Sequence, residues 1–382
     1  MMIDPSKRSS HPPKKLDPHE AIGDKIPEAD QPLPDEAIGE DELHRPQPAD
    51  DPLPRVDSQD LYQVMRHTID RLEHDQTARG DLKLLSRTLR ELRYAFTVFR
   101  PYRRRRKVTI FGSARTPPGA PGYESAVELA RQVAQHGWMV VTGAGGGIME
   151  AGHRGAGREA SMGLNIMLPF EQGANPYIEN DPKLVTLKYF FTRKLMFLKE
   201  SSGVVCLPGG FGTLDEALET LTLLQTGKQT MMPLIYMDHP GGSYWKDLGD
   251  FFRKQLLCGG MISPDDVALY KVTSSVEETI EELMQFYDVY HSMRFVGDSL
   301  VLRVKEPISE ELMEEIQTSF PDILSSGRFE QSEALPEESG EPEIAHLPRL
   351  VFHFNRRTFG RLRMLINRIN GHPLTTTPAS DC

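Results

Sequence analysis

A glycine-rich segment at residues 204–216 combines residue types that could bind an anion and act on it. Val-Val-Cys-Leu precedes Pro-Gly-Gly-Phe-Gly-Thr-Leu-Asp-Glu, a pattern that predicts a strand, a tight loop and a helix. Gly209, Gly210 and Gly212 let the backbone approach a ligand closely. The free N–H groups of the new helix and the Thr213 hydroxyl could then donate hydrogen bonds to a phosphate or another anion.

Glu216 closes this segment, within the first turn of the predicted helix. A carboxylate there can simply cap the helix. It can also stand beside a bound phosphorylated ligand, as a base or as a contact to a ribose. The density of glycines before it favours the second interpretation.

Short β-branched runs alternate with helical stretches from Val108 onward. This predicts βαβ units and an α/β fold with a Rossmann-like, doubly wound parallel sheet that has helices on both faces. The predicted strands are residues 108–111, 138–142, 163–168, 184–188, 203–207, 234–237 and a short one at 268–272. Three strand ends carry glycine loops, at 111–113, 142–147 and 207–210. Ligands bind outside the carboxyl ends of such strands, so we expect one shared pocket.

The second glycine cluster does not have the spacing of a dinucleotide-binding fingerprint. With Gly143 and Gly145 as its first two glycines, the third would fall at Ile148, and no acidic residue ends a strand about 20 residues later. Neither cluster is followed by the Gly-Lys-Ser/Thr of a Walker loop. A nicotinamide cofactor is therefore disfavoured, and the loops suit one phosphate better than a triphosphate.

Three other charged residues give weaker signals. Glu171 follows the predicted strand at 163–168, where a carboxylate is usually just solvated. Arg193 and Lys194 open a predicted helix, and basic residues near a helix start oppose its dipole. Their position indicates either an anion site or an ordinary surface pair.

The chain divides into four predicted segments. Residues 1–57 hold 11 of the 29 prolines and many acidic residues, which predicts a disordered tail. Residues 58–106 have apolar residues at three- and four-residue intervals, which predict two helices broken near Gly80. The Rossmann-like domain is predicted at 107–290, and 291–382 should form a small α+β appendage. The elements predicted in that appendage are strands at 299–304, 327–334 and 349–355 and helices at 309–319 and 358–369.

A basic run at residues 103–107 consists of four arginines and a lysine. It could be a solvated helix end that complements the helix dipole. It could also contact a phosphate or an acidic partner. The sequence does not separate these two interpretations.

Composition excludes several functional classes. The formal charge is −11, of which residues 1–60 contribute −8 through 15 acidic and 7 basic side chains, so general nucleic-acid binding is disfavoured. The three cysteines do not have the spacing of a disulfide framework or a zinc site, and a reducing compartment fits. No apolar run approaches the ~20 residues that cross a bilayer. The N-terminus does not have the pattern of a signal peptide. We therefore expect a cytoplasmic protein without a metal site.

Taken together, these motifs resemble the LOG ("Lonely guy") family, in the long form found in bacteria. The resemblance covers roughly residues 107–290. It rests on Phe-Gly-Ser at 111–113, Gly-Gly-Gly-Ile-Met-Glu at 145–150, Pro-Phe-Glu at 169–171, Arg-Lys at 193–194 and above all Pro-Gly-Gly-Phe-Gly-Thr-Leu-Asp-Glu at 208–216. LOG proteins are cytokinin riboside 5′-monophosphate phosphoribohydrolases that were long mislabelled as lysine decarboxylases.

This resemblance implies hydrolysis of the N-glycosidic bond of a nucleoside 5′-monophosphate to free base and ribose 5-phosphate, without a cofactor. It implies that Arg193 and Glu216 are catalytic, with Glu216 stabilising the positive charge that develops on the ribose. The substrate-binding residues that it implies are Gly112, Ser113, Gly145, Gly146, Gly147, Glu171, Lys194, Gly209, Gly210, Gly212, Thr213 and Thr222. It also implies a homodimer or a higher homo-oligomer.

The loops at 111–113 and 145–150 differ from those of plant members, so AMP or another nucleoside monophosphate is as plausible a substrate as a prenylated adenine nucleotide. The alternative hypothesis is a non-catalytic protein that binds or carries a nucleotide or molybdenum cofactor through the same glycine loops. Retention of both Arg193 and Glu216 favours the enzyme, because a carrier does not need that pair.

Overall fold

The structure is a computed structural model that describes residues 59–168 and 173–373. The predicted tail at 1–57 lies outside these residues. Two separate sheets form within the described part of the chain, one of seven strands and one of four.

The seven-stranded sheet is parallel throughout and has the order β4-β3-β2-β1-β5-β6-β7. Its strands are β1 (Lys107–Phe111), β2 (Met139–Thr142), β3 (Ser161–Ile166), β4 (Leu184–Leu187), β5 (Gly203–Cys206), β6 (Leu234–Met237) and β7 (Lys271–Thr273). The central strands β1, β2 and β5 are buried along their whole length, which explains their continuous apolar composition. The predicted α/β class and parallel sheet are confirmed, and each predicted strand is present within about three residues of its place.

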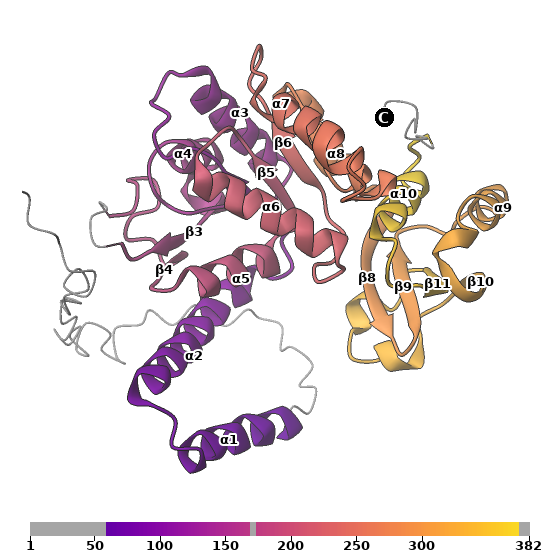
Figure 1. Cartoon of the computed structure of the whole chain (residues 1–382), viewed down its shortest axis with the longest axis horizontal. Coiled ribbons are helices and arrows are strands. Elements are labelled where there is room, and N and C mark those ends of the chain that lie inside the picture. Colours follow the sequence, from indigo (N-terminus) through magenta and orange to yellow (C-terminus); the bar gives the residue numbers. More distant parts are fainter. Residues whose placement is uncertain (1–58, 169–172, 374–382) are drawn as a thin grey trace, which may run out of the picture. The chain divides into compact units, whose positions relative to one another are not determined.

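Helices cover the sheet (Figure 1). They are α3 (Pro121–Gln135), α4 (Ile148–Ala160), α5 (Phe190–Glu200), α6 (Phe211–Gln225), α7 (Tyr244–Phe251) and α8 (Val276–Gln285). Helix α3 packs against α4 and α8, while α5 packs against an N-terminal helix described below. The strand order reverses between β1 and β5, which pair directly, with Phe111 opposite Cys206. In a doubly wound sheet this switch point is where a ligand crevice opens.

The second sheet is antiparallel, in the order β10-β11-β9-β8. Its strands are β8 (Tyr290–Val296), β9 (Ser299–Val304), β10 (Leu324–Ser332) and β11 (Arg349–Phe354), accompanied by helices α9 (Glu310–Ser319) and α10 (Phe359–Ile369). Strand β8 was not predicted, because its sequence, Tyr-His-Ser-Met-Arg-Phe-Val, lacks a regular alternation of apolar and polar residues. It begins at the proposed domain boundary near residue 290. Arg363 of α10 is buried and bonded to Glu282 of α8, so this region also contacts the first.

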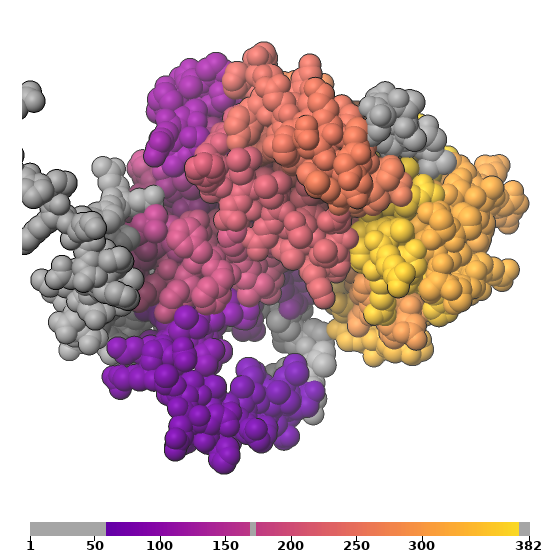
Figure 2. All heavy atoms as spheres, viewed as in Figure 1, coloured from indigo at the N-terminus to yellow at the C-terminus, as the bar shows by residue number. Residues whose placement is uncertain are grey.

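Two helices precede the first sheet, as predicted. They are α1 (Gln59–His74) and α2 (Arg79–Phe99). The break between them falls at residues 75–78, near Gly80, which is the second residue of α2. Helix α2 buries Glu91, Ala95, Val98 and Phe99 near its end, whereas α1 buries no residue. Figure 2 shows the atoms of both helices in indigo at the bottom of the view, where they are exposed on the face that is drawn.

The basic run at 103–107 makes tertiary contacts instead of facing solvent as a group. The Arg105 guanidinium donates to the Gly137 carbonyl oxygen at 3.2 Å, and the Arg106 guanidinium lies 3.6 Å from the centre of the Tyr287 ring. Lys107 is buried, and its ammonium lies 3.4 Å from the Glu200 carboxylate. Arg106 and Lys107 are therefore structural, whereas Arg103, Arg104 and Arg105 remain exposed.

Candidate active site

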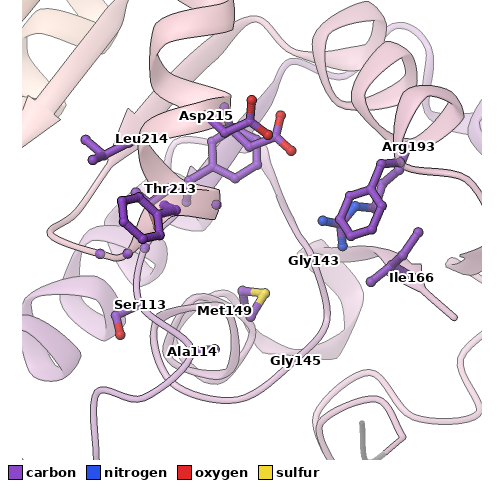
Figure 3. Close-up of a pocket in the computed structure, with 18 of the residues that line it drawn as sticks. Ser113, Ala114, Gly143, Gly145, Met149, Ile166, Arg193, Thr213, Leu214 and Asp215 are labelled. Atoms are coloured by element: carbon purple, nitrogen blue, oxygen red, sulfur yellow. The ribbon is translucent and has the colours of Figure 1, made fainter. Parts of the chain in front are cut away.

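A cavity of about 760 Å³ lies at the carboxyl ends of β1, β2 and β5, at the switch point of the sheet. Residues from all three predicted glycine loops line it, as expected for converging loops. The predicted site residues among its lining are Gly112, Ser113, Gly145, Arg193, Gly209, Gly210, Gly212, Thr213 and Glu216. Figure 3 shows Arg193 on one side of this cavity and Thr213 and Asp215 on the other.

The glycine loop between β5 and α6 is fixed to the loop that follows β1. The Leu207 amide donates to the Phe111 carbonyl oxygen at 2.8 Å, and the Ser113 amide donates to the Pro208 carbonyl oxygen at 3.2 Å. From the other side, the Tyr244 hydroxyl donates to the Gly209 carbonyl oxygen at 2.8 Å. The loop is therefore held in place before any ligand arrives, which lowers the cost of ordering it.

Different physical constraints require glycine at the three glycine positions of this loop. A Cβ on Gly209 would lie 2.2 Å from the Thr213 hydroxyl oxygen and 2.9 Å from the Ser113 amide nitrogen, so packing requires this glycine. A Cβ on Gly210 or Gly212 would meet no atom within 4 Å. Both of these line the cavity, so only a bound ligand would need the space that they leave.

The start of α6 presents backbone donors beside these glycines. The amides of Thr213 and Leu214 donate to the Gly210 carbonyl oxygen, at 3.0 and 3.1 Å. Within residues 59–168 and 173–373, no protein acceptor receives the amides of Gly210, Phe211 or Gly212. Unsatisfied N–H groups at a helix N-terminus form an anion site.

We expect the glycines to separate ligand binding from folding. Gly210→Ala and Gly212→Ala should keep the wild-type melting temperature and weaken AMP binding by about 10-fold or more, because each Cβ occupies ligand space without striking the protein. Gly209→Ala should instead lower the melting temperature by several degrees through its clash with Thr213. Thermal melts and calorimetric titration with AMP measure both effects. If Gly210→Ala and Gly212→Ala bound AMP as tightly as the wild type, the phosphate would not bind at these glycines.

Glu216 projects from the first turns of α6 into the same cavity, where 7 % of its surface remains exposed. Burial raises the pKa of its carboxyl to about 7, against the opposing effects of Lys194 and Arg193. A carboxyl group with a pKa near neutrality can exchange a proton readily at physiological pH, which suits general acid–base catalysis.

Lys194 lies behind this carboxyl and is not among the residues that line the cavity. Its ammonium lies 2.8 Å from the Asp215 carboxylate, 2.5 Å from Glu219 and 4.0 Å from Glu216. Three carboxylates thus surround the ammonium, and a direct contact of Lys194 with the substrate stays a prediction. Lys194 supplies positive charge next to Glu216.

Arg193 is carried by α5 and faces Glu216 across the cavity. Its guanidinium carbon lies 5.1 Å from the centre of the Phe190 ring and 5.6 Å from that of Phe197, which limits its movement. Figure 3 shows it directed toward Gly143. The cavity thus has the Arg193 guanidinium on one side. On the other side are the Glu216 carboxyl group and the backbone donors at the start of α6.

The second glycine cluster acts mainly by packing. Gly145 lines the cavity and contacts the Met149 side chain, but Gly146 and Gly147 do not line it. Gly147 has a φ of 64°, and a Cβ there would lie 2.3 Å from the Ser113 carbonyl oxygen. Gly147 therefore lets this loop approach the one that contains Ser113, and ligand contacts of Gly146 and Gly147 stay a prediction.

Two further predicted residues are not placed in the cavity. Thr222 lies on an exposed part of α6, where its hydroxyl donates to the Leu218 carbonyl oxygen at 2.8 Å. It lines a separate, mostly apolar cavity of about 260 Å³, because six residues of helix carry it away from Glu216. Glu171 lies outside the described residues.

Sequence reasoning missed several residues that support or line the cavity. Phe190, Phe211 and Met149 line it, and Phe211 is 92 % exposed in the middle of the glycine string, an unusual position for an aromatic ring. Behind the second glycine cluster, buried His153 and Asn175 form hydrogen bonds that hold the loop from Ala144 to Gly145. Burial lowers the pKa of His153 to about 4, so it stays neutral in this network.

Comparison with known proteins gives the following similarities. Residues 146–283 match a family described as "Possible lysine decarboxylase". A rice protein, "Probable cytokinin riboside 5′-monophosphate phosphoribohydrolase LOGL5", is 31% identical over 125 residues, which cover 31% of this chain and 49% of the rice protein. The cytokinin riboside 5′-monophosphate phosphoribohydrolase of Mycobacterium tuberculosis is 27% identical over 172 residues, which cover 44% of this chain and 88% of that protein.

Among solved structures, the molybdenum cofactor carrier protein of Chlamydomonas reinhardtii is 22% identical, with a TM-score of 0.34, over 48% of this chain and 98% of the carrier. The chain spans about half the length of the rice relative. Each of these three proteins matches less than half of this chain. The similarity lies in the central domain, which contains the cavity.

Proposed function

We propose, from the premise that the central domain is related to the LOG family, that this chain hydrolyses the N-glycosidic bond of a nucleoside 5′-monophosphate. The substrate class is a purine nucleoside monophosphate such as AMP or a cytokinin riboside monophosphate. The products are the free base and ribose 5-phosphate.

One observation carries this proposal. The buried Glu216 carboxyl, the free amides at the start of α6 and the Arg193 guanidinium border a single cavity. A 5′-phosphate on the amides would bring the sugar toward a carboxyl group about one helical turn further along. The chemistry needs an anion site and a carboxylate at about that separation.

The proposed reaction breaks the bond between C1′ and the base nitrogen and forms a bond from C1′ to a water oxygen. Positive charge builds on the ribose as the base departs with the bonding electrons, and the ionised Glu216 stabilises that charge. The same carboxylate accepts a proton from the attacking water, and the departing base takes up a proton in turn. No oxidant or reductant is needed for this balance.

Arg193 is proposed to hold the substrate from the side opposite Glu216. Its planar fork can donate two parallel hydrogen bonds to a phosphate or to acceptor atoms of the base, which a lysine cannot do. The aromatic rings beside it would keep this fork oriented before the substrate binds. Decarboxylation of lysine has no support in the lining, since pyridoxal chemistry needs a Schiff-base lysine and the lining of this cavity in the described residues contains none.

The test is incubation of the purified chain with a panel of nucleoside 5′-monophosphates, followed by chromatography of free base and ribose 5-phosphate. The proposal expects equal amounts of both products, and far less from the matching nucleosides, which lack the phosphate that the amides would bind. Purified protein that retains an intact nucleotide or a pterin, and releases no base from any member of the panel, would favour the carrier alternative.

The activity should depend on pH through Glu216. Burial raises the pKa of this carboxyl to about 7 and the proposed role needs its ionised form, so kcat/KM should rise as pH increases through about 7. Lys194→Met removes the largest charge that lowers this pKa, so the acid limb should move to higher pH. Rate profiles of both proteins measure the shift. A rate that falls across the same range would contradict the role as a base.

We also propose a homo-oligomer. Helix α1 exposes Leu61, Met65 and Ile69 on one side, and an isolated helix of this length is only marginally stable in water. Light scattering should therefore give more than one chain per particle, whereas a monomer at micromolar concentration would contradict this. Among the described residues, no helix is long and apolar enough to span a bilayer. Cytoplasmic location and the lack of a nucleic-acid partner remain predictions.

A further inference from the structure

We infer that Glu91 of helix α2 is a positioning residue for Arg193. The inference rests on the proposed function and deepens it, because it assigns part of the site to the N-terminal segment. Residue 91 lies well before the matched family segment at 146–283. Helix α2, which lies outside the segment that matches the family, would then help to orient the Arg193 guanidinium.

The Glu91 carboxylate receives three hydrogen bonds although only 5 % of the residue is exposed. The backbone amide of Lys188 donates to it at 2.8 Å, and the Thr192 hydroxyl lies 2.9 Å from its second oxygen. The Arg87 guanidinium donates at 2.9 Å from the preceding turn of α2 and balances the buried charge. Ionised acceptors make the stronger class of hydrogen bond, so these contacts hold α2 to the segment before α5.

These contacts fall where α5 begins. The helix starts at Phe190, and the residue at its N-cap, Tyr189, makes no side-chain capping bond. A carboxylate near a helix N-terminus is favoured by the partial positive charge there. Glu91 therefore anchors the start of α5 from another helix, through the amide of Lys188 just before it and the Thr192 side chain in its first turn.

Helical geometry connects the Glu91 contacts to the cavity. Phe190, Arg193 and Phe197 share one face of α5 and line the cavity, whereas Thr192 and Met196 are buried on another face. Thr192 immediately precedes Arg193, so a loss of the Glu91 contact would let the first turn of α5 rotate or fray. Displacement by ~1 Å of a catalytic group can lower a rate by about 100-fold.

The experiment compares Glu91→Gln with Asp81→Asn, which removes an exposed carboxylate from the same helix. We expect Glu91→Gln to lower kcat for AMP by about 10-fold or more, with a smaller change in KM, while Asp81→Asn matches the wild type. Hydrogen exchange at residues 188–193 should become at least ~10-fold faster in Glu91→Gln alone. This second readout needs no turnover, so it separates a failure of the inference from a failure of the proposed function.

A double-mutant cycle distinguishes positioning from a general loss of stability. In an Arg193→Ala background, Glu91→Gln should lower kcat no further, because the group that it positions is gone. If Glu91→Gln does not fold, Thr192→Val removes the hydroxyl contacts to Glu91 and to the Tyr189 carbonyl oxygen while Glu91 keeps its other two, and it should lower kcat. Thr192→Ser, which keeps the hydroxyl, should retain activity. Two results would overturn the inference. One is an unchanged hydrogen-exchange rate at residues 188–193 in Glu91→Gln. The other is a double mutant whose loss of kcat equals the product of the losses in the two single mutants.

Discussion

Glu216→Gln should lower kcat for release of base from AMP by about 1,000-fold, while AMP still binds. The amide keeps the shape of the side chain in a buried position but has no charge to stabilise the ribose cation and no basic oxygen to accept the proton of water. Loss of both effects is why the change should be so large. Because the neutral amide carries no negative charge to repel the anionic substrate, affinity for AMP should be equal or higher.

The measurement is single-turnover release of adenine, with AMP affinity determined by calorimetry. Glu277→Gln is the matched control, since it removes an exposed carboxylate from the first turn of α8. It should retain wild-type kcat. If Glu216→Gln released base as quickly as Glu277→Gln, this carboxyl would have no part in the mechanism.

Arg193→Ala should lower kcat/KM for AMP by about 100- to 1,000-fold. The substitution removes a preorganised cation from the cavity and leaves the anionic substrate with the α6 amides alone. Arg193→Lys should recover little of this loss, because an ammonium keeps the charge but not the planar fork. Phe190 and Phe197, which flank the guanidinium, would also lose their cation–π contact.

Steady-state kinetics with AMP measures this effect, and Arg131→Ala is the control. Arg131 lies on α3, where its guanidinium pairs with Glu128 at the surface. That variant should behave as wild type. Near-complete activity in Arg193→Lys would show that only the charge matters and would contradict the proposed role of the fork.

Local patterns were enough to predict the parallel sheet and its loops. Short β-branched runs that end in glycine predict strands without knowledge of their neighbours, because a strand buried on both faces must be apolar along its whole length. Strand β8 was missed because its sequence lacks a regular alternation of polar and apolar residues, and only its pairing with β9 shows that it is a strand. The break between α1 and α2 was predicted near Gly80 and lies at residues 75–78, because a glycine in the first turn of a helix is tolerated.

The site was predictable where one segment contains all its parts. Gly209, Gly210, Gly212, Thr213 and Glu216 follow one another along a single loop and helix, so their sequence spacing fixes their geometry. Lys194 and Thr222 do not line the cavity, which the sequence did not indicate: Lys194 pairs with carboxylates of α6, and Thr222 lies six residues beyond Glu216 on its own helix. Glu91 could not have been found at all, since 97 residues separate it from Lys188, and no spacing rule joins an N-terminal helix to the start of α5.

A crystal structure of Glu216→Gln with AMP tests the central claim most directly. The account predicts the 5′-phosphate on the amides of residues 210–212, Arg193 in contact with the nucleotide and C1′ of the ribose facing residue 216. A nucleotide whose phosphate binds away from these amides, or whose sugar turns away from residue 216, would contradict it.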